Sequence, residues 1–255
     1  MLDRAFDTPL EPEEHAAVPF AGGIKQNGYQ CGMIWGSVLA AGAQAHKVYG
    51  PGAESQTRAV AAAQKLVETF RADTGEINCY EITEIDKDSS AMQMVTYFLL
   101  KGGTVSCMKM AGRFAPKAFE DIKSIMNAEI GETAELPVSC AARVAEHLGA
   151  DPRQTVMASG LAGGIGLCGG GCGALGTAIW FKGMEMQKDP EVKNLWQDKT
   201  FTPAFDELVE RFLAASDYEF ECEQITGRKF ETPAEHAAFI KDGGCARIIE
   251  AMSSS

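Results

Sequence analysis

The sequence predicts an all-α protein made of two similar helical bundles, which arise from an internal duplication and pack as a pseudo-dimer. Three observations lead to this prediction. Apolar residues recur every three to four positions through much of the chain, which is the spacing of one helix face. No segment alternates convincingly between apolar and polar residues, as a half-buried strand would. Short blocks of sequence also recur at a nearly constant separation, which indicates a repeated structural unit.

The duplication is clearest around the first cysteine. Residues 21–32 read AGGIKQNGYQCG and residues 162–173 read AGGIGLCGGGCG, so seven of twelve positions are identical at a separation of 141. Further blocks match in the same order: Leu66–Phe70 with Leu208–Phe212, Cys79–Thr83 with Cys222–Thr226, and Phe98–Gly103 with Phe239–Gly244. We therefore assign copy 1 to residues 1–130 and copy 2 to residues 131–255.

The elements follow in chain order. Residues 1–20 are acidic and contain three prolines, so we expect an irregular lead-in. Apolar spacing predicts helices over these segments: 60–70, 91–100, 116–128, 138–148, 174–181, 205–213 and 234–240. Thr232 followed by Pro233 is a typical helix start. The glycine pairs at 102–103 and 243–244 are expected to end helices just before the last cysteine of each copy.

Composition narrows the class of protein. The 255 residues are 45% hydrophobic and carry a net charge of −12, which argues against nucleic acid and anionic membranes as partners. The acidic start contains no apolar segment typical of a signal peptide, and no run of about 18 apolar residues predicts membrane insertion. We therefore expect a cytoplasmic protein. Since the cytosol keeps thiols reduced, its eight cysteines point to metal binding, a cluster or redox chemistry.

The cysteines fall into two groups. Cys140 and Cys168 have no counterpart in copy 1. The other six correspond in pairs between the copies: Cys31 with Cys172, Cys79 with Cys222, and Cys107 with Cys245. Each recurring cysteine lies beside a glycine or at an expected helix boundary rather than within an apolar stripe. This recurrence favours a shared functional site over incidental core cysteines.

The glycine-rich stretch Gly160–Thr177 is the centre of copy 2. Its glycines would allow sharp turns and a close approach of the backbone to a ligand. The apolar run that follows places Cys172 at a helix start, where unpaired N–H groups and the helix dipole should lower its pKa and make it reactive. Cys168 and Cys172 form a CxxxC pair, which could act as a redox dithiol or supply two metal ligands.

These residues resemble the family of redox-active proteins named for the C-GCAxxG-C-C cysteine signature. In copy 2 the resemblance takes Cys140 as the leading cysteine and continues through Gly171–Gly176, Cys222 and Cys245. Copy 1 matches more faintly, because it has Met33 in the glycine–cysteine core and no leading cysteine. The resemblance implies redox function, and similar domains attached to multi-centre cytochromes have cysteines that look like iron–sulfur ligands.

The leading hypothesis is an electron-transfer or accessory redox protein that binds an iron–sulfur cluster and serves a redox partner protein. N–H groups around Gly171 and Gly173 would donate hydrogen bonds to the sulfur atoms of the cluster in copy 2. Four thiolates would hold this cluster: those of Cys140, Cys172, Cys222 and Cys245. Cys31, Cys79 and Cys107 would form an incomplete site in copy 1. Two alternatives stay open: a thiol–disulfide oxidoreductase in which Cys172 attacks and Cys168 or Cys140 resolves, without a cofactor, and a zinc or soft-metal site. The oligomeric state is also left open.

Overall fold

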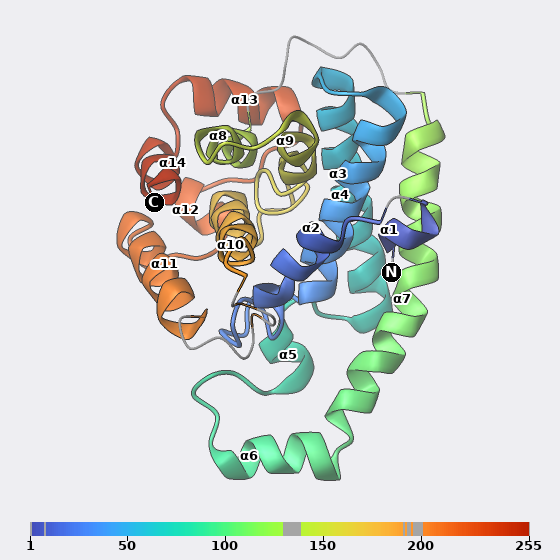
Figure 1. Ribbon diagram of the computed structural model, residues 1–255, viewed down its shortest axis with the longest axis vertical. Helices are drawn as coiled ribbons and strands as arrows, with labels where there is room; N and C mark the ends of the chain where they lie inside the picture. Colours follow the sequence, from blue (N-terminus) through green and yellow to red (C-terminus); the bar gives the residue numbers. More distant parts are fainter. Residues whose placement is uncertain are drawn as a thin grey trace.

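A computed structural model describes residues 2–7, 9–129, 139–190, 192, 195 and 201–254 of the chain. The described residues form helices and loops without a β-strand, which confirms the all-α prediction (Figure 1). The helices of copy 1 are α1 (Leu2–Ala5), α2 (Glu11–Ala16), the 3-10 turn η1 (Val18–Phe20), α3 (Gly32–Tyr49), α4 (Ala53–Thr74), α5 (Cys79–Thr83), α6 (Ala91–Val95), the π-helical turn η2 (Thr96–Leu100) and α7 (Gly103–Asn127). Those of copy 2 are α8 (Cys140–His147), α9 (Pro152–Ser159), α10 (Gly173–Met186), α11 (Phe201–Ala215), α12 (Cys222–Thr226), α13 (Pro233–Lys241) and α14 (Ala246–Ser253).

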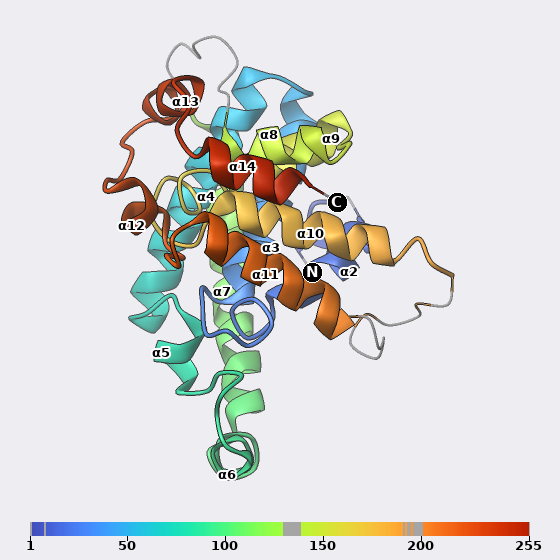
Figure 2. The same cartoon turned by 90° about the vertical axis from the view of Figure 1, so that its left-hand side faces the viewer.

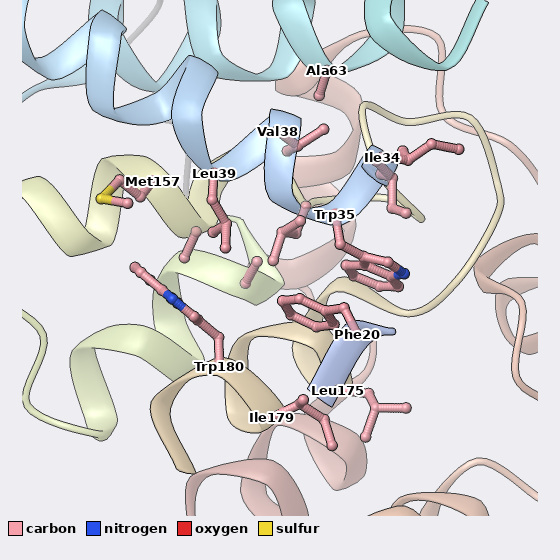
Figure 3. Packing of buried hydrophobic residues seen from close by; sticks show 14 of the residues in the cluster. Phe20, Ile34, Trp35, Val38, Leu39, Ala63, Met157, Leu175, Ile179 and Trp180 are labelled. Carbon is pink, nitrogen blue, oxygen red and sulfur yellow. The ribbon is translucent and has the colours of Figure 1, made fainter. Parts of the chain in front are cut away.

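The two helices that follow the glycine loops, α3 and α10, form the centre of the core. Both bury residues around most of their circumference, as expected of helices surrounded by other helices. Trp35 on α3 is fully buried and stacks on Phe20, with ring centroids 5.0 Å apart (Figure 3). Although both helices are apolar, no helix among the described residues has the length and apolar character needed to cross a membrane.

Several helices differ from the sequence-based prediction. The prediction that residues 1–20 are irregular is wrong, because this segment contains α1, α2 and η1. Helices α3, α5, α12 and α14 were also not predicted from the sequence. The helix expected to begin at Pro116 begins at Gly103, so the proline lies inside α7, where its missing N–H removes one hydrogen bond without ending the helix. Helix α9 was not predicted, although Asp151 and Gln154 form a capping box around Pro152 that marks its start. The helix start at Thr232 is confirmed, since its side chain accepts a hydrogen bond from the Glu235 N–H. The Val138 end of the predicted helix 138–148 lies outside the described residues.

The two copies make equivalent contacts with each other. Helix α9 of copy 2 packs on α3 of copy 1, and α2 of copy 1 packs on α10 of copy 2. A side chain on Gly42 would overlap Met157, and one on Gly183 would lie 2.6 Å from the Ala16 carbonyl oxygen. Gly42 and Gly183 are 141 residues apart in the sequence, and so are Ala16 and Met157. The same close approach of helices is therefore made twice, once in each direction between the copies.

Candidate functional site

All four signature cysteines of copy 2 lie at helix starts. Cys140 and Cys222 are the first residues of α8 and α12, and Cys172 and Cys245 are the N-caps of α10 and α14. Helices α8, α10, α12 and α14 come together in one half of the molecule (Figures 1 and 2). Because the first N–H groups of a helix lack partners within the helix, these starts surround the thiols with hydrogen-bond donors.

Backbone donors link two of these cysteines directly. The Ala174 N–H, in the first turn of α10, faces the sulfur atoms of both Cys172 and Cys140. The Gly163 N–H, from the glycine-rich loop, also faces Cys140. One helix start and one loop therefore bring together thiols that are 32 residues apart in the sequence. The donors of this loop expected from the sequence were Gly171 and Gly173, and Gly163 was not among them.

The four thiols of copy 2 interact electrostatically. Burial is the largest cause of the raised pKa of Cys172, and the negative charges of Cys140 and Cys245 raise this pKa further. Burial also dominates at Cys222, where charges on the other three cysteines add to it. Burial and then the charge of Cys140 raise the pKa of Cys245 to about 12. Ionising one thiol thus makes ionising the others harder, so the neutral form is favoured in the absence of a compensating cation.

The predicted low pKa of Cys172 is wrong. Cys172 does lie at a helix start, and the N–H groups of Leu175 and Ala174 lower its pKa. However, only 6% of the residue is exposed, and the cost of burying a thiolate outweighs these hydrogen bonds. Cys172 is therefore not a preformed nucleophile, which weakens the dithiol alternative.

Cys168 occupies a different environment from the other cysteines of copy 2. It is half-buried, and its thiol donates to the Gly166 carbonyl oxygen at 3.5 Å. Burial raises its pKa to about 11, and the charges that act on it are those of Arg71, Glu68 and Lys229. Its loop position therefore faces charged side chains of both copies.

The difference in burial and pKa between Cys168 and Cys172 leads to a labelling prediction for the metal-free, reduced protein. We expect iodoacetamide at pH 8 to modify Cys168 before Cys172, because Cys168 is more exposed and its pKa of about 11 leaves a larger thiolate fraction. Since both pKa values are raised, labelling of both should accelerate as the pH rises. Mass spectrometry of tryptic peptides gives the two rates, and faster labelling of Cys172 would show that the helix start dominates after all.

Gly171 and Gly173 are required by packing. A Cβ atom on Gly171 would overlap the side-chain oxygen of Gln30, and one on Gly173 would overlap the Leu161 carbonyl oxygen. Gln30 is 1% exposed and neither of its amide atoms has a hydrogen-bond partner within the described part of the chain. Glycine at these two positions therefore allows Gln30 of copy 1 and the Leu161 backbone to pack directly against the segment that carries Cys172.

Copy 1 places two of its three cysteines at helix starts. Cys31 is the N-cap of α3, Cys79 begins α5, and Cys107 lies in the second turn of α7. Burial raises the pKa of Cys31 to about 12, with smaller contributions from charges on Cys79 and Cys107. The Tyr97 hydroxyl lies 3.7 Å from the Cys107 sulfur. Sequence reasoning missed Tyr97, because the aligned blocks pair Phe98, its neighbour, with Phe239.

Neither copy has its thiols joined in a disulfide or arranged as a complete metal site among the described residues. All eight cysteines are free. Across the described residues, no three or more histidine, cysteine, aspartate or glutamate side chains are already arranged to hold a metal ion. In copy 2 the donor set nevertheless has the number and chemistry that an iron–sulfur cluster uses, namely four thiols. Binding a cluster would require the thiols to lose their protons and the cysteine side chains to move until each sulfur atom coordinates it.

Comparison with protein-family models gives two matches, over residues 1–120 and 138–254. Both are to the family described as "Putative redox-active protein (C_GCAxxG_C_C)". No curated protein and no solved structure matches the chain. The two matches lie on the two halves of the duplication and together cover most of the sequence. The chain therefore belongs to the C_GCAxxG_C_C family of redox-active proteins and contains its unit twice.

Proposed function

We propose that this protein is an electron-transfer or accessory redox protein in which Cys140, Cys172, Cys222 and Cys245 hold an iron–sulfur cluster. The observation that carries the proposal is that these four thiols, from four separate helix starts, act on one another electrostatically. Four cysteines are the usual ligand set of [2Fe–2S] and [4Fe–4S] clusters, and when bound the cluster supplies reversible one-electron storage.

The electrostatics favour a bound cation over free-thiol chemistry. A buried thiol with a raised pKa is a poor nucleophile, because little thiolate is present at neutral pH. A coordinating metal ion deprotonates a thiol outright, and its positive charge offsets the mutual repulsion of the thiolates. The same burial that hinders a dithiol mechanism would exclude water from a cluster.

The surroundings of the four cysteines fit this role. The N–H groups of Gly163 and Ala174 face sulfur, and such hydrogen bonds tune a cluster's reduction potential. Cys245 is more exposed than the other ligands and lines a cavity of about 290 Å³ with Asp217 and Arg247. These two residues form an ion pair at 2.8 Å. This side is where we expect a redox partner protein to approach most closely.

Anaerobic purification, followed by absorption spectroscopy and analysis of iron, zinc and acid-labile sulfide, tests the proposal. We expect broad visible absorption together with iron and sulfide in the same sample. If the protein is colourless even after reconstitution with ferrous iron and sulfide, and carries stoichiometric zinc, the zinc alternative replaces the cluster. If it is colourless without metal and instead cycles between a dithiol and a disulfide, the oxidoreductase alternative replaces it.

A further inference from the structure

The exposed apolar side chains of this protein are concentrated in one segment. The described residues include ten large apolar side chains that are exposed, and seven of them lie within residues 91–109, which we call the arm. Val105 and Met108 lie in the first turns of α7, and five lie on α6 and η2: Met92, Val95, Phe98, Leu99 and Leu100. Clustered apolar surface of this kind marks a contact with another protein or with a membrane.

The arm projects from one end of the molecule, as both views of the ribbon show (Figures 1 and 2). Among the described helices, the main packing partner of α6 is η2, which is its own continuation. Leu99 and Leu100, at the end of η2, are 76% and 79% exposed. The apolar side chains of the arm therefore stand on a protruding ridge.

The corresponding segment of copy 2 is buried instead. It comprises α13 and the start of α14, where Ile240 and Ile248 are 1% and 3% exposed. Phe239 packs against a buried cluster that includes Val60 of copy 1 and Leu167 of the glycine-rich loop. Protein thus covers in copy 2 the apolar residues that copy 1 leaves exposed on the arm.

Two differences between the copies account for the exposure of the arm. In copy 2 the ring of Phe239 lies against Gly244, five residues further along the chain. In copy 1 the ring of Tyr97 lies against Gly103, six residues further along, and η2 accommodates the extra residue because a π-turn inserts one residue into a helix. Copy 1 also has three more residues between its glycine pair and its last cysteine, and they lengthen the start of α7.

The charge of the arm is opposite in sign to that of the chain. Residues 89–119 contain no aspartate or glutamate and four basic residues: Lys101, Lys109, Arg113 and Lys117. The first pairs with Glu84 and the last two pair with Asp73, so Lys109 is the one without an ion pair among the described residues. Charges act over about 8 Å at physiological ionic strength. A surface that meets the arm therefore interacts with Lys109 more than with the net charge of −12.

We propose that the arm attaches this protein to the surface of a lipid bilayer, with its apolar side chains between the headgroups and Lys109 beside anionic lipids. This inference does not depend on a bound cluster. A fluid bilayer accepts a protruding apolar ridge directly, whereas a protein partner must offer a matching groove. Pairing of two arms would bring two copies of Lys109 together, with no carboxylate in residues 89–119 to offset them. A helix held in this way lies along the bilayer and does not cross it.

Cosedimentation of the full chain with vesicles tests the proposal. One set of vesicles is phosphatidylcholine alone, and the other contains phosphatidylcholine and phosphatidylglycerol in equal amounts. We expect binding to both and tighter binding to the anionic set. Leu99→Gln/Leu100→Gln should weaken binding to both sets by about tenfold or more, because two buried leucines are lost. Lys109→Gln should weaken binding to the anionic set by about fivefold and leave binding to phosphatidylcholine unchanged.

Tyr218→Gln/Val48→Gln is the matched control, because these side chains are 79% and 49% exposed but lie outside the arm. It should bind as the wild type does, and circular dichroism checks that every variant is folded. Equal loss of binding in the two double variants would show that any exposed apolar residue suffices, which overturns the assignment to the arm.

A fluorescence measurement locates the contact. The emission of Phe98→Trp, taken as a difference from the wild type, should shift to shorter wavelength with vesicles and be quenched by lipids brominated on their acyl chains. Tyr218→Trp should show neither effect. Failure of the wild type to bind either set of vesicles contradicts the proposal. If the wild type instead self-associates in light scattering and Leu99→Gln/Leu100→Gln makes it monomeric, the arm binds a second copy of the chain and the bilayer is the wrong partner.

Discussion

If copy 2 binds the proposed iron–sulfur cluster, replacing Cys172 with alanine is expected to abolish the bound iron and sulfide of that copy and their visible absorption. Cys172 is the N-cap of α10, and the charges of Cys140 and Cys245 act on its thiol, so it belongs to the proposed ligand set. Removing even a supporting partner of a metal ligand commonly lowers affinity by about 10–100-fold, and removing a ligand should cost at least as much. Iron and sulfide per chain, measured after reconstitution, give the effect.

Cys168→Ala is the control for this change. Cys168 lies four residues earlier in the same loop, but its thiol donates to the Gly166 carbonyl oxygen. We expect this variant to keep its iron, its sulfide and its absorption spectrum. Equal loss in both variants would mean that the loop, rather than the Cys172 sulfur, is what the centre requires. Full retention in Cys172→Ala would remove this residue from the ligand set.

Trp35→Ala should strongly lower the free energy of unfolding. The indole is fully buried, stacks on Phe20 and donates to the Gln30 carbonyl oxygen at 3.2 Å. It also covers Gly176 of α10, where a side chain would overlap the indole ring. Truncating a buried tryptophan to alanine costs about 3–5 kcal/mol, from lost burial and the cavity left behind. That is a large part of the roughly 5–15 kcal/mol typical of a domain's unfolding free energy.

Urea unfolding of the metal-free, reduced protein, followed by circular dichroism, measures this change. Met92→Ala on α6 is the comparison, since Met92 is 74% exposed and its loss should change the unfolding free energy by about 0.5 kcal/mol or less. A similar small effect for Trp35→Ala would show that α3 and α10 do not depend on each other through this side chain. Their contact would then contribute little to the joining of the copies.

The fold class and the presence of two copies of one unit could be predicted from the sequence, because each copy repeats the pattern of the other. Blocks that recur at one separation identify helices and cysteines twice, so chance similarity is reduced. The start of α7 was missed because Pro116 resembles a helix start, and only tertiary packing shows that the helix continues through it. Helix boundaries depend on such context more than helix existence does.

The acidity of Cys172 and the position of Tyr97 could not be obtained in this way. A helix start is visible in the sequence, but the burial that outweighs it depends on neighbouring elements that are distant along the chain. Likewise, the aligned blocks give Phe98 as the counterpart of Phe239. Only the π-turn shows that Tyr97 takes that place. In both cases the unpredicted property is the orientation or the surroundings of a residue. These depend on tertiary packing and not on the local sequence pattern.

The reciprocal contacts of α9 with α3 and of α2 with α10 have an evolutionary consequence. In a homodimer of identical single-unit chains, every substitution would be inherited by both sites at once. Joining the two units in one chain lifts that restriction, because each site then has its own codons while the shared core stays intact. Copy 2 has four signature cysteines, whereas residues 1–130 have three, with the Tyr97 hydroxyl beside Cys107. In such a chain, one site can acquire substitutions while the other site keeps the residues needed for the original function.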